Sequence, residues 1–553
     1  MIDLRVRRLL TLALGCIAFL AGAASVKAAE GLAELRAKGS VVIGVKSDYA
    51  PWGFRDSFGR LRGMDVELGE DLARRIGVPA NIVAVTSANR LELLRQGQVD
   101  IIVATLGDSA NRRRQVHMVE PHYYASGIQL MMSGSADVHE WEDIRGATVC
   151  ALQGTYFNKP IAERFALDLR IFKDSREAKL ALRDRRCAGY LFDGSAIASD
   201  LLLPEWQGYA TPLPALDETG WAIALRPGAA GGDLARLVSE AVIDWHRSGL
   251  LVRMEAKWNI RPTKFLADMH QAWSARDASG NFVCPTDPPY PLKCMPTDIS
   301  LQAQPVEKTR GPLETWLRNN NVDLTILFDP YDSRQFRRGL LNTIGLALAC
   351  LVLSVIIGLV GASLLAARNR LVRWLATAFV EFFRYTPPLV QLYFFFFGIG
   401  AMLPLMRSDT GLETPMLDGF SWAVIVLGIY AGASNAIIFR AGMDAITADI
   451  REAAISLGYG PFLTYWRILL PMALRRSISA LNANLINIVK ATGLAAAIAV
   501  PELLYVTNQI WPEQGNIITM MNVLLVSFFV LISVLVAVMN RIERRLRLPG
   551  RSP

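Results

Sequence analysis

The chain has 553 residues, which is too long for one domain and predicts about three or four. Hydrophobic residues make up 52% and charged residues 20%, a balance that indicates a soluble part joined to a membrane part. The net charge of +8 would favour a nucleic-acid-binding protein, but many arginines flank apolar segments, so they indicate membrane topology instead.

The first 28 residues predict a secretory signal peptide. Arg5, Arg7 and Arg8 precede an apolar stretch over 9–24, and small residues follow where a signal peptidase would cut. An uncleaved membrane anchor is the alternative. Either way, we expect the chain to lie outside the cytoplasm until its next membrane span.

Region 30–260 is expected to be a soluble α/β domain. Short apolar runs such as 41–45 alternate with stretches of helical spacing such as 66–76. A second α/β unit begins near 141, and the run 221–225 leads back to the first. Two lobes linked by two crossings form a clam-shell, an architecture that captures small ligands. The expected boundaries are about 40–130 and 221–258 for one lobe, and about 135–220 for the other.

Four of the six cysteines fall in the part expected to be exported. Cys150 and Cys187 lie in strand-like runs, and Cys284 and Cys294 bracket a proline-rich turn. An oxidising compartment makes each pair a disulfide candidate, with two buried free thiols as the alternative for the first pair. The second pair lies in 261–335, which is rich in Pro, Asp, Asn and Lys and is expected to be a linker.

An all-α membrane domain is expected over 336–547. It contains five apolar segments, each near the ~20 residues that a bilayer requires. Arginines follow the first segment, flank the loop after the third and end the chain, so the positive-inside rule places all three clusters in the cytoplasm. The predicted spans are about 339–364, 380–405, 420–439, 478–502 and 518–539.

The loop 449–471 carries the most specific pattern in the chain. Glu452 is followed by two small residues, Ala453 and Ala454, which allow close helix packing. Gly458 allows a sharp turn, and Pro471 limits where the next helix can begin. The pattern resembles the coupling loop of bacterial ABC importer permeases, which docks onto the ATPase subunit. An ordinary amphipathic loop helix is the alternative.

Segment 381–392 resembles the signature of polar amino acid permeases of the histidine, glutamate, glutamine, arginine and opine type. It contains a Pro-Pro pair, which breaks a helix and is tolerated in a membrane only against protein or a cavity. The chain departs from the family pattern at 449–451, where Gly-Gln is usual. It departs again at 490–493, where Lys-Asp-Thr-Ser is usual.

Region 40–260 resembles the family 3 periplasmic amino-acid-binding proteins through segments 41–45, 48–52, 59–63, 99–102, 111–112 and 123–124. The resemblance implies that Arg112 holds an α-carboxylate by two parallel hydrogen bonds and that Asp193 holds the α-ammonium. A solvated arginine run and a turn at Asp193 are the alternatives. The ligand-binding residues implied in this way are Lys46, Tyr49, Trp52, Arg90, Gly107, Ser109, Arg112, Gln153, Thr155 and Asp193.

Two cations in this set bear on specificity. Lys46 and Arg90 occupy positions where extra positive charge favours a ligand with a second carboxylate and repels a basic side chain. We therefore expect an acidic amino acid, with neutral polar or aromatic amino acids next. The alternative is that both cations pair at the surface with acids such as Asp48 or Glu92.

The sequence contains no G-x-x-x-x-G-K-[ST] phosphate loop, so ATP and Mg²⁺ are expected on a separate ATPase subunit. A second permease half is also expected, most simply a copy of this chain. A ligand-gated channel or amino-acid receptor could use the same clam-shell, but such receptors insert their pore between its halves, whereas here the membrane part follows it whole. An enzyme or metal site is not expected, because the five histidines are scattered. The chain is thus predicted to lie in a bacterial inner membrane with its binding domain in the periplasm and its C-terminus in the cytoplasm.

Overall fold

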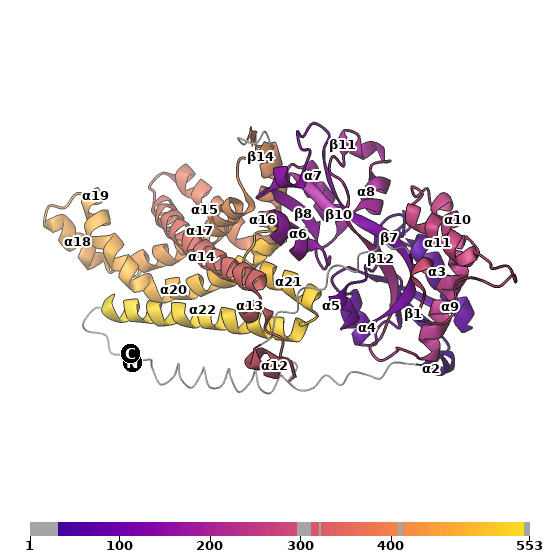
Figure 1. The fold of residues 1–553 in the computed structure, drawn as a ribbon. Coiled ribbons are helices and arrows are strands. Elements are labelled where there is room, and N and C mark those ends of the chain that lie inside the picture. The colour runs from indigo at the N-terminus through magenta and orange to yellow at the C-terminus, as the bar shows by residue number, and fades with distance from the viewer. Residues whose placement is uncertain (1–30, 296–310, 320–321, 408–412, 547–553) are drawn as a thin grey trace.

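The structure, a computed structural model, describes residues 31–295, 311–319, 322–407 and 413–546. An α/β N-terminal part (31–295) and a helical part (322–546) lie side by side (Figure 1). The expected signal peptide over 1–28 and residues 296–310 of the expected linker lie outside the described residues.

One nine-stranded sheet runs through the N-terminal part in the order β5-β1-β6-β12-β7-β10-β8-β9, with β11 paired to β7. A smaller sheet has the order β2-β3-β4. The strands are β1 (Val41–Lys46), β2 (Asp48–Tyr49), β3 (Gly53–Arg55), β4 (Leu61–Arg62), β5 (Ala80–Val85), β6 (Ile101–Ile102), β7 (His117–Ser133), β8 (Thr148–Leu152), β9 (Asp168–Phe172), β10 (Gly189–Asp193), β11 (Tyr209–Ala210) and β12 (Leu216–Leu225).

The two longest strands, β7 and β12, connect two lobes. Near its start β7 pairs with β12, and near its end it pairs with β10. The β7–β12 register shifts between Leu216 and Thr219 and again between Trp221 and Ile223, and such irregularities bend a strand. Lobe 1 holds β1 to β6 and lobe 2 holds β8 to β11. The predicted two-lobed clam-shell fold is confirmed.

Helices provide the crossovers that parallel strands require. In α3, Leu68, Leu72 and Ile76 recur at helical spacing and are fully buried, and the helix ends at Gly77 with φ +87°. The helices of this part are α2 (Leu32–Lys38), α3 (Met64–Ile76), α4 (Arg90–Arg95), α5 (Ala110–Arg113), α6 (Asn158–Phe165), α7 (Ser175–Arg183), α8 (Gly194–Asp200), α9 (Asp233–Arg247), α10 (Leu250–Lys257) and α11 (Lys264–Ser274).

Both candidate cysteine pairs are bonded. Cys150–Cys187 joins β8 to the segment before β10, with Cα atoms 5.5 Å apart. Cys284–Cys294 closes the loop that follows α11, with Cα atoms 5.7 Å apart. Helix α11 packs on α9, and the Tyr290 hydroxyl lies 2.8 Å from the hydroxyl of Ser239 on α9. Residues 264–294 of the expected linker are therefore folded against lobe 1.

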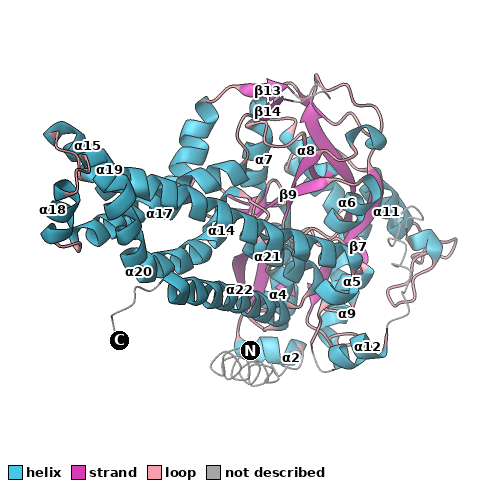
Figure 2. Cartoon of the chain, turned by 90° about the vertical axis from the view of Figure 1, so that its left-hand side faces the viewer, coloured by secondary structure: helices cyan, strands magenta, loops and turns pink. Residues whose placement is uncertain are grey.

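In the helical part, strands are confined to one hairpin, β13 (Leu405–Arg407) with β14 (Glu413–Pro415), as Figure 2 shows for the described residues. The helices are α12 (Pro312–Asn319), α13 (Thr325–Phe328), α14 (Pro330–Leu365), α15 (Arg370–Tyr385), α16 (Pro388–Tyr393), α17 (Gly419–Asp444), α18 (Ala448–Ser456), α19 (Pro461–Thr464), α20 (Leu470–Ala491), α21 (Leu503–Gln514) and α22 (Ile517–Leu546).

Four described helices are long and apolar enough to cross a membrane. They are Pro330–Leu365, Gly419–Asp444, Pro461–Ile498 and Ile517–Arg545, and each overlaps a predicted span. The span expected over 380–405 is not one helix. It divides into α15 and the shorter apolar helix Pro388–Met402, which ends in π-helical and 3₁₀ turns.

The break in this span follows from its Pro-Pro pair. Thr386 precedes Pro387 and has an extended conformation (φ −89°, ψ 138°), since a residue before proline is restricted in the α region. The Gln391 side-chain amide donates to the carbonyls of Phe383 (2.8 Å) and Thr386 (3.0 Å), and so satisfies groups that the break leaves exposed.

The loop expected over 449–471 is a helix–turn–helix. Helix α18 ends before Gly458, whose φ of +82° gives the expected sharp turn, and α19 follows at Pro461. Pro471 does not mark the start of the next helix, because a π-helical segment, Tyr465–Leu469, precedes it without a break. Figure 1 shows α18 and α19 at the end of the helical part farthest from the N-terminal part.

Candidate functional site

The two lobes are in contact along a closed seam. The hydroxyl of Tyr49 on β2 donates to Oδ2 of Asp193 at the end of β10 (2.9 Å). The backbone N–H of Ser175 in lobe 2 donates to Asp48 in lobe 1 (3.2 Å). Six of the ten residues predicted to bind ligand have buried side chains at this seam: Lys46, Tyr49, Trp52, Arg90, Arg112 and Asp193.

Arg112 reaches across the seam from lobe 1. Ser109 caps the short helix α5, and its hydroxyl accepts from the Arg112 N–H (3.4 Å). The Arg112 guanidinium is buried and donates to the carbonyls of Gly107 (2.8 Å) and Gly154 (3.0 Å), one on each lobe. Gly107 has no room for a side chain, because a Cβ would lie 2.5 Å from the ring of Tyr156. The loop around Gly107 therefore fixes the arginine in place.

Asp193 lies on lobe 2, where it accepts from the Tyr49 hydroxyl and has Arg90, Lys46 and Arg112 as nearby cations. Burial raises the pKa of its carboxyl to about 6, although the Tyr49 hydrogen bond and nearby cations oppose that shift. One oxygen, Oδ1, is buried and has no hydrogen-bond partner among the described residues. A buried carboxylate oxygen without a donor is costly, and an ammonium group would satisfy it.

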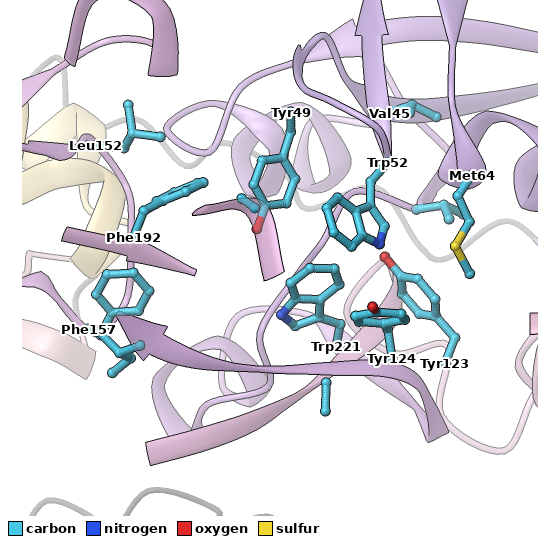
Figure 3. Close-up of a cluster of buried hydrophobic side chains, with 14 of the residues drawn as sticks. Val45, Tyr49, Trp52, Met64, Tyr123, Tyr124, Leu152, Phe157, Phe192 and Trp221 are labelled. Atoms are coloured by element: carbon cyan, nitrogen blue, oxygen red, sulfur yellow. The ribbon is translucent and has the colours of Figure 1, made fainter. Parts of the chain in front are cut away.

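Aromatic rings line the seam (Figure 3). Trp52 stacks on Tyr49 with ring centroids 5.4 Å apart and meets Trp221 edge-on at 5.5 Å. Phe192 from lobe 2 contacts the Tyr49 ring edge-on at 5.0 Å. The indole N–H groups of Trp52 and Trp221 are buried without a partner within the described chain. These rings give the seam apolar walls with a few polar groups, as small-molecule sites have.

Lys46 and Arg90 differ in how their charges are balanced. The Lys46 ammonium is buried, lies 3.1 Å from Asp48 and donates to Ser87 (2.8 Å). Arg90 donates to the carbonyls of Ala104 and Thr105 instead of to an acid. Burial, and then the neighbouring Arg112 charge, lower the pKa of Arg90 to about 9. Lys46 thus pairs with Asp48, the acid that the alternative interpretation named, but its ammonium is buried and not at the surface as that interpretation expected. Arg90 is held by backbone groups.

Asp65 is a buried acid that the sequence interpretation did not include. It is fully buried at the start of α3 and accepts from the Thr105 N–H and the Tyr123 hydroxyl, both at 3.1 Å. Burial raises its pKa to about 7. Trp221 and Tyr156 were also missed. Trp221 opens the apolar run 221–225, which lies within β12, and Tyr156 directly follows the loop 153–155.

Gln153 and Thr155 do not turn their side chains into the seam. The Thr155 hydroxyl donates to Leu152 within its own loop (2.8 Å). The Gln153 side-chain amide donates to the backbone carbonyl of Asn508 on α21, in the helical part. The loop 153–155 contacts Arg112 through its backbone, because the Gly154 carbonyl accepts from the Arg112 guanidinium.

The tip of the helical part, formed by α18, the Gly458 turn and α19, exposes apolar side chains. Ile455, Leu457 and Phe462 are 62%, 76% and 74% exposed. Glu452 and Ala453 are also exposed, while Ala454 packs inward. In the part of the chain that the structure describes, no group of three or more His, Cys, Asp or Glu side chains could hold a metal ion.

Each part of the chain matches a protein family. Residues 41–261 match the bacterial extracellular solute-binding proteins, family 3. Residues 334–548 match the binding-protein-dependent transport system inner membrane component.

Individual relatives cover either part. The probable amino-acid permease protein YxeN of Bacillus subtilis is 32% identical over 161 residues, which are 29% of this chain and 68% of that protein. The L-cystine-binding protein TcyJ of Escherichia coli is 27% identical over 248 residues, 44% of this chain and 91% of that protein. A solved structure of the solute receptor for L-cysteine of Neisseria gonorrhoeae is 23% identical, with a TM-score of 0.40 over 42% of this chain and 98% of that one.

Proposed function

Because this chain belongs to the binding-protein-dependent amino-acid transporters and fuses their solute-binding and inner-membrane components, we propose that it captures an amino acid between its lobes and delivers it to its own membrane domain. The observation that carries this proposal is that Arg112 and Asp193 are buried on opposite lobes of a closed seam, near enough for the arginine charge to act on the carboxyl group. Arg112 would hold the α-carboxylate. Asp193 would hold the α-ammonium through Oδ1.

The ligand side chain is proposed to be acidic, with a neutral polar side chain as the second candidate. Arg90 favours an acidic ligand, because its guanidinium is buried and forms no ion pair with a described Asp or Glu. The Lys46–Asp48 ion pair favours the neutral ligand, because it leaves a single surplus cation at this end of the seam. The neutral ligand also agrees with the cystine-binding relative.

The tip is proposed to dock onto a cytoplasmic ATPase subunit that holds ATP and Mg²⁺. Its exposed apolar side chains would be covered by that partner. Two further contacts hold arginine-rich segments at the same end of the helical part as the tip. Arg476 on α20 donates to the Ala445 carbonyl before α18, and Ser479 donates to Glu543 on α22 (2.9 Å). With these segments in the cytoplasm, the N-terminal part would lie in the periplasm.

A second permease half is part of the same proposal, most simply another copy of this chain. Exposed apolar side chains along α15, such as Trp374, Phe379 and Phe382, would face lipid or that second half. Residues 1–28 are proposed to direct the N-terminal part across the membrane.

A ligand panel tests the proposal on the full chain in lipid nanodiscs, by calorimetry with glutamate, aspartate, glutamine, cystine and arginine. We expect glutamate or aspartate to bind most tightly and arginine not to bind. Asp48→Asn removes the partner of Lys46 and should shift preference further towards acidic ligands, by roughly 1–2 kcal/mol. Tightest binding of arginine would contradict the charge argument, and failure of every amino acid to bind would contradict the proposed function.

A further inference from the structure

A buried acid and a buried histidine form a pair beside the loop that carries Arg112. Nε2 of the His122 ring lies 2.8 Å from Oδ2 of Asp108, and both residues are buried in lobe 1. We propose that this pair positions Arg112, so that His122 and Asp108 set the affinity for the α-carboxylate by acting through the arginine. The inference rests on the proposed function, because it requires Arg112 to hold that carboxylate.

His122 lies in a bulge of β7. Between two register pairs of the β7–β12 ladder, residues 120–123 of β7 stand opposite residue 222 of β12 alone. A bulge bends its strand and changes the direction of a side chain, and bulges are common next to active sites. The bulge therefore frees the His122 ring from the regular alternation of the strand.

The His122 ring passes over β12 at Gly220. Strand β12 lies between β7 and β6, and the loop after β6 continues along β12 on the side away from β7. There the Asp108 N–H donates to the Gly220 carbonyl (2.8 Å), and Gly107 forms a bridge with Trp221. A Cβ at Gly220 would lie 2.4 Å from Nδ1 of His122, so the glycine leaves the room that the ring needs. His122 thus reaches Asp108 across the strand between them.

Asp108 ties the last residue of helix α5 to the loop before that helix. Its Oδ1 accepts from Nε of Arg113 (2.8 Å), and its Oδ2 lies against both Arg113 and His122. Burial would raise the pKa of the Asp108 carboxyl, but the hydrogen bonds from His122 and Arg113 outweigh burial and hold that pKa below its usual range. An ionised carboxylate only accepts, so Nε2 of His122 carries the proton and donates.

These contacts fix the backbone from which Arg112 projects. Helix α5 has four residues, and so short a helix is not stable by itself. Ser109 caps its start, while Asp108 and Glu120 hold Arg113 at its end, and Glu120 belongs to the same bulge as His122. Arg112 lies between these two attachments, so a shift at Asp108 would move its guanidinium along the seam.

The backbone of His122 is anchored to the helices of lobe 1. Nε2 of His246 on α9 lies 2.8 Å from the His122 carbonyl, and Nδ1 of His270 on α11 lies 2.7 Å from the His246 carbonyl. Burial lowers the pKa of His246 to about 4, so this ring is neutral. The bulge is thus fixed by lobe 1 alone, and a site that is ordered before the ligand arrives loses less free energy on binding.

A double-mutant cycle on the full chain in lipid nanodiscs tests this role. His122→Phe keeps a ring and removes the donor, and His122→Gln places an amide donor at a similar reach. Arg112→Lys keeps the charge and loses the planar fork. The matched control is His139→Phe, because His139 also pairs with an aspartate, Asp137 (3.1 Å), but is 84% exposed at its side chain. Calorimetry with glutamate, glutamine and cystine measures affinity, and the melting temperature of the ligand-free chain is measured alongside.

We expect His122→Phe to weaken amino-acid binding by about tenfold or more, as for the loss of a buried hydrogen bond to a charged group. His122→Gln should recover most of that loss, and His139→Phe should bind as the unchanged chain does. When Arg112→Lys is already present, His122→Phe should cause little further loss, because its effect passes through Arg112. A merely structural role would lower the melting temperature and weaken binding equally in both backgrounds.

Equal losses from His122→Phe with and without Arg112→Lys would overturn the inference, and so would unchanged affinity in His122→Phe. If His122→Phe does not fold, Gly220→Ala takes its place in the cycle, because it displaces the ring and keeps both polar groups. If the unchanged chain binds none of the three amino acids, the proposed function fails and this inference with it. A chain that binds an amino acid without coupling between His122 and Arg112 overturns this inference alone.

Discussion

Two regions of the molecule expose charge and apolar surface differently. One is the seam between the two lobes, and the other is the tip at α18 and α19. The seam buries Arg112 and Asp193 among aromatic rings, whereas the tip exposes Leu457 and Phe462. Burial strengthens each polar contact to a small ligand. Exposed apolar groups gain free energy only when a large partner covers them. Recognition of ligand and of partner should therefore respond to different substitutions.

The largest expected effect is at Arg112. Arg112→Ala removes one member of the charge pair that would hold the ligand, so it should weaken amino-acid binding by about 2–5 kcal/mol. Calorimetry on the full chain in nanodiscs measures the loss. Arg114→Ala is the matched control, because Arg114 is exposed and donates to Asn111 at 3.2 Å. Equal affinity in the two variants would remove Arg112 from the site.

A smaller effect, confined to the tip, is expected at Gly458. Gly458→Trp places a side chain at φ +82°, which strains the turn by roughly 1–2 kcal/mol, without a clash inside the chain. We expect ATP hydrolysis to be uncoupled from uptake while ligand affinity is unchanged. Reconstituted vesicles with the cognate ATPase provide both measurements.

Gly460→Trp is the control for that variant, because Gly460 also faces open space but has φ −66°. It adds the same bulk to the tip without the backbone strain. If both variants lose coupling to the same degree, bulk at the tip matters and the turn does not. If Gly458→Trp couples normally, the tip is not the contact that the proposal requires.

Ligand affinity at the seam should depend on pH, whereas coupling through the tip should not. Asp193 has a pKa of about 6 and must be ionised to accept an ammonium group. Affinity should therefore be full well above the pKa and should fall as the pH drops through it, by up to about 1.4 kcal/mol per pH unit. Asp65→Asn removes the nearby acid with a pKa of about 7 and should leave this profile in place. A flat profile from about pH 7 to about pH 5 would exclude Asp193 as the ammonium ligand.

Patterns local in the sequence predicted most of the fold. Alternating apolar runs predicted the two lobes, and the spacing around Gly458 predicted the turn that its φ of +82° provides. The Pro-Pro pair predicted a helix break, but 380–405 was still counted as one span, because most of its residues are apolar and hydropathy does not register a missing backbone donor.

Contacts between distant segments were out of reach. Even the local Lys46–Asp48 ion pair could be named from the sequence only as an alternative, because the turn between β1 and β2 decides whether the two side chains meet. The family resemblance of the loop 153–155 placed Gln153 in the ligand site, yet its side chain contacts Asn508 in the helical part. No periodicity links residues so far apart, and only packing decides where such a side chain points.

The covalent join between the two parts has a consequence for binding strength. A tether keeps the N-terminal part near the helical part at an effective concentration that is in the millimolar range for short flexible linkers. The contact between Gln153 and Asn508 can therefore be weak and still be occupied most of the time. A weak contact also releases quickly, so the two lobes could open and close repeatedly while the chain keeps them beside the helical part.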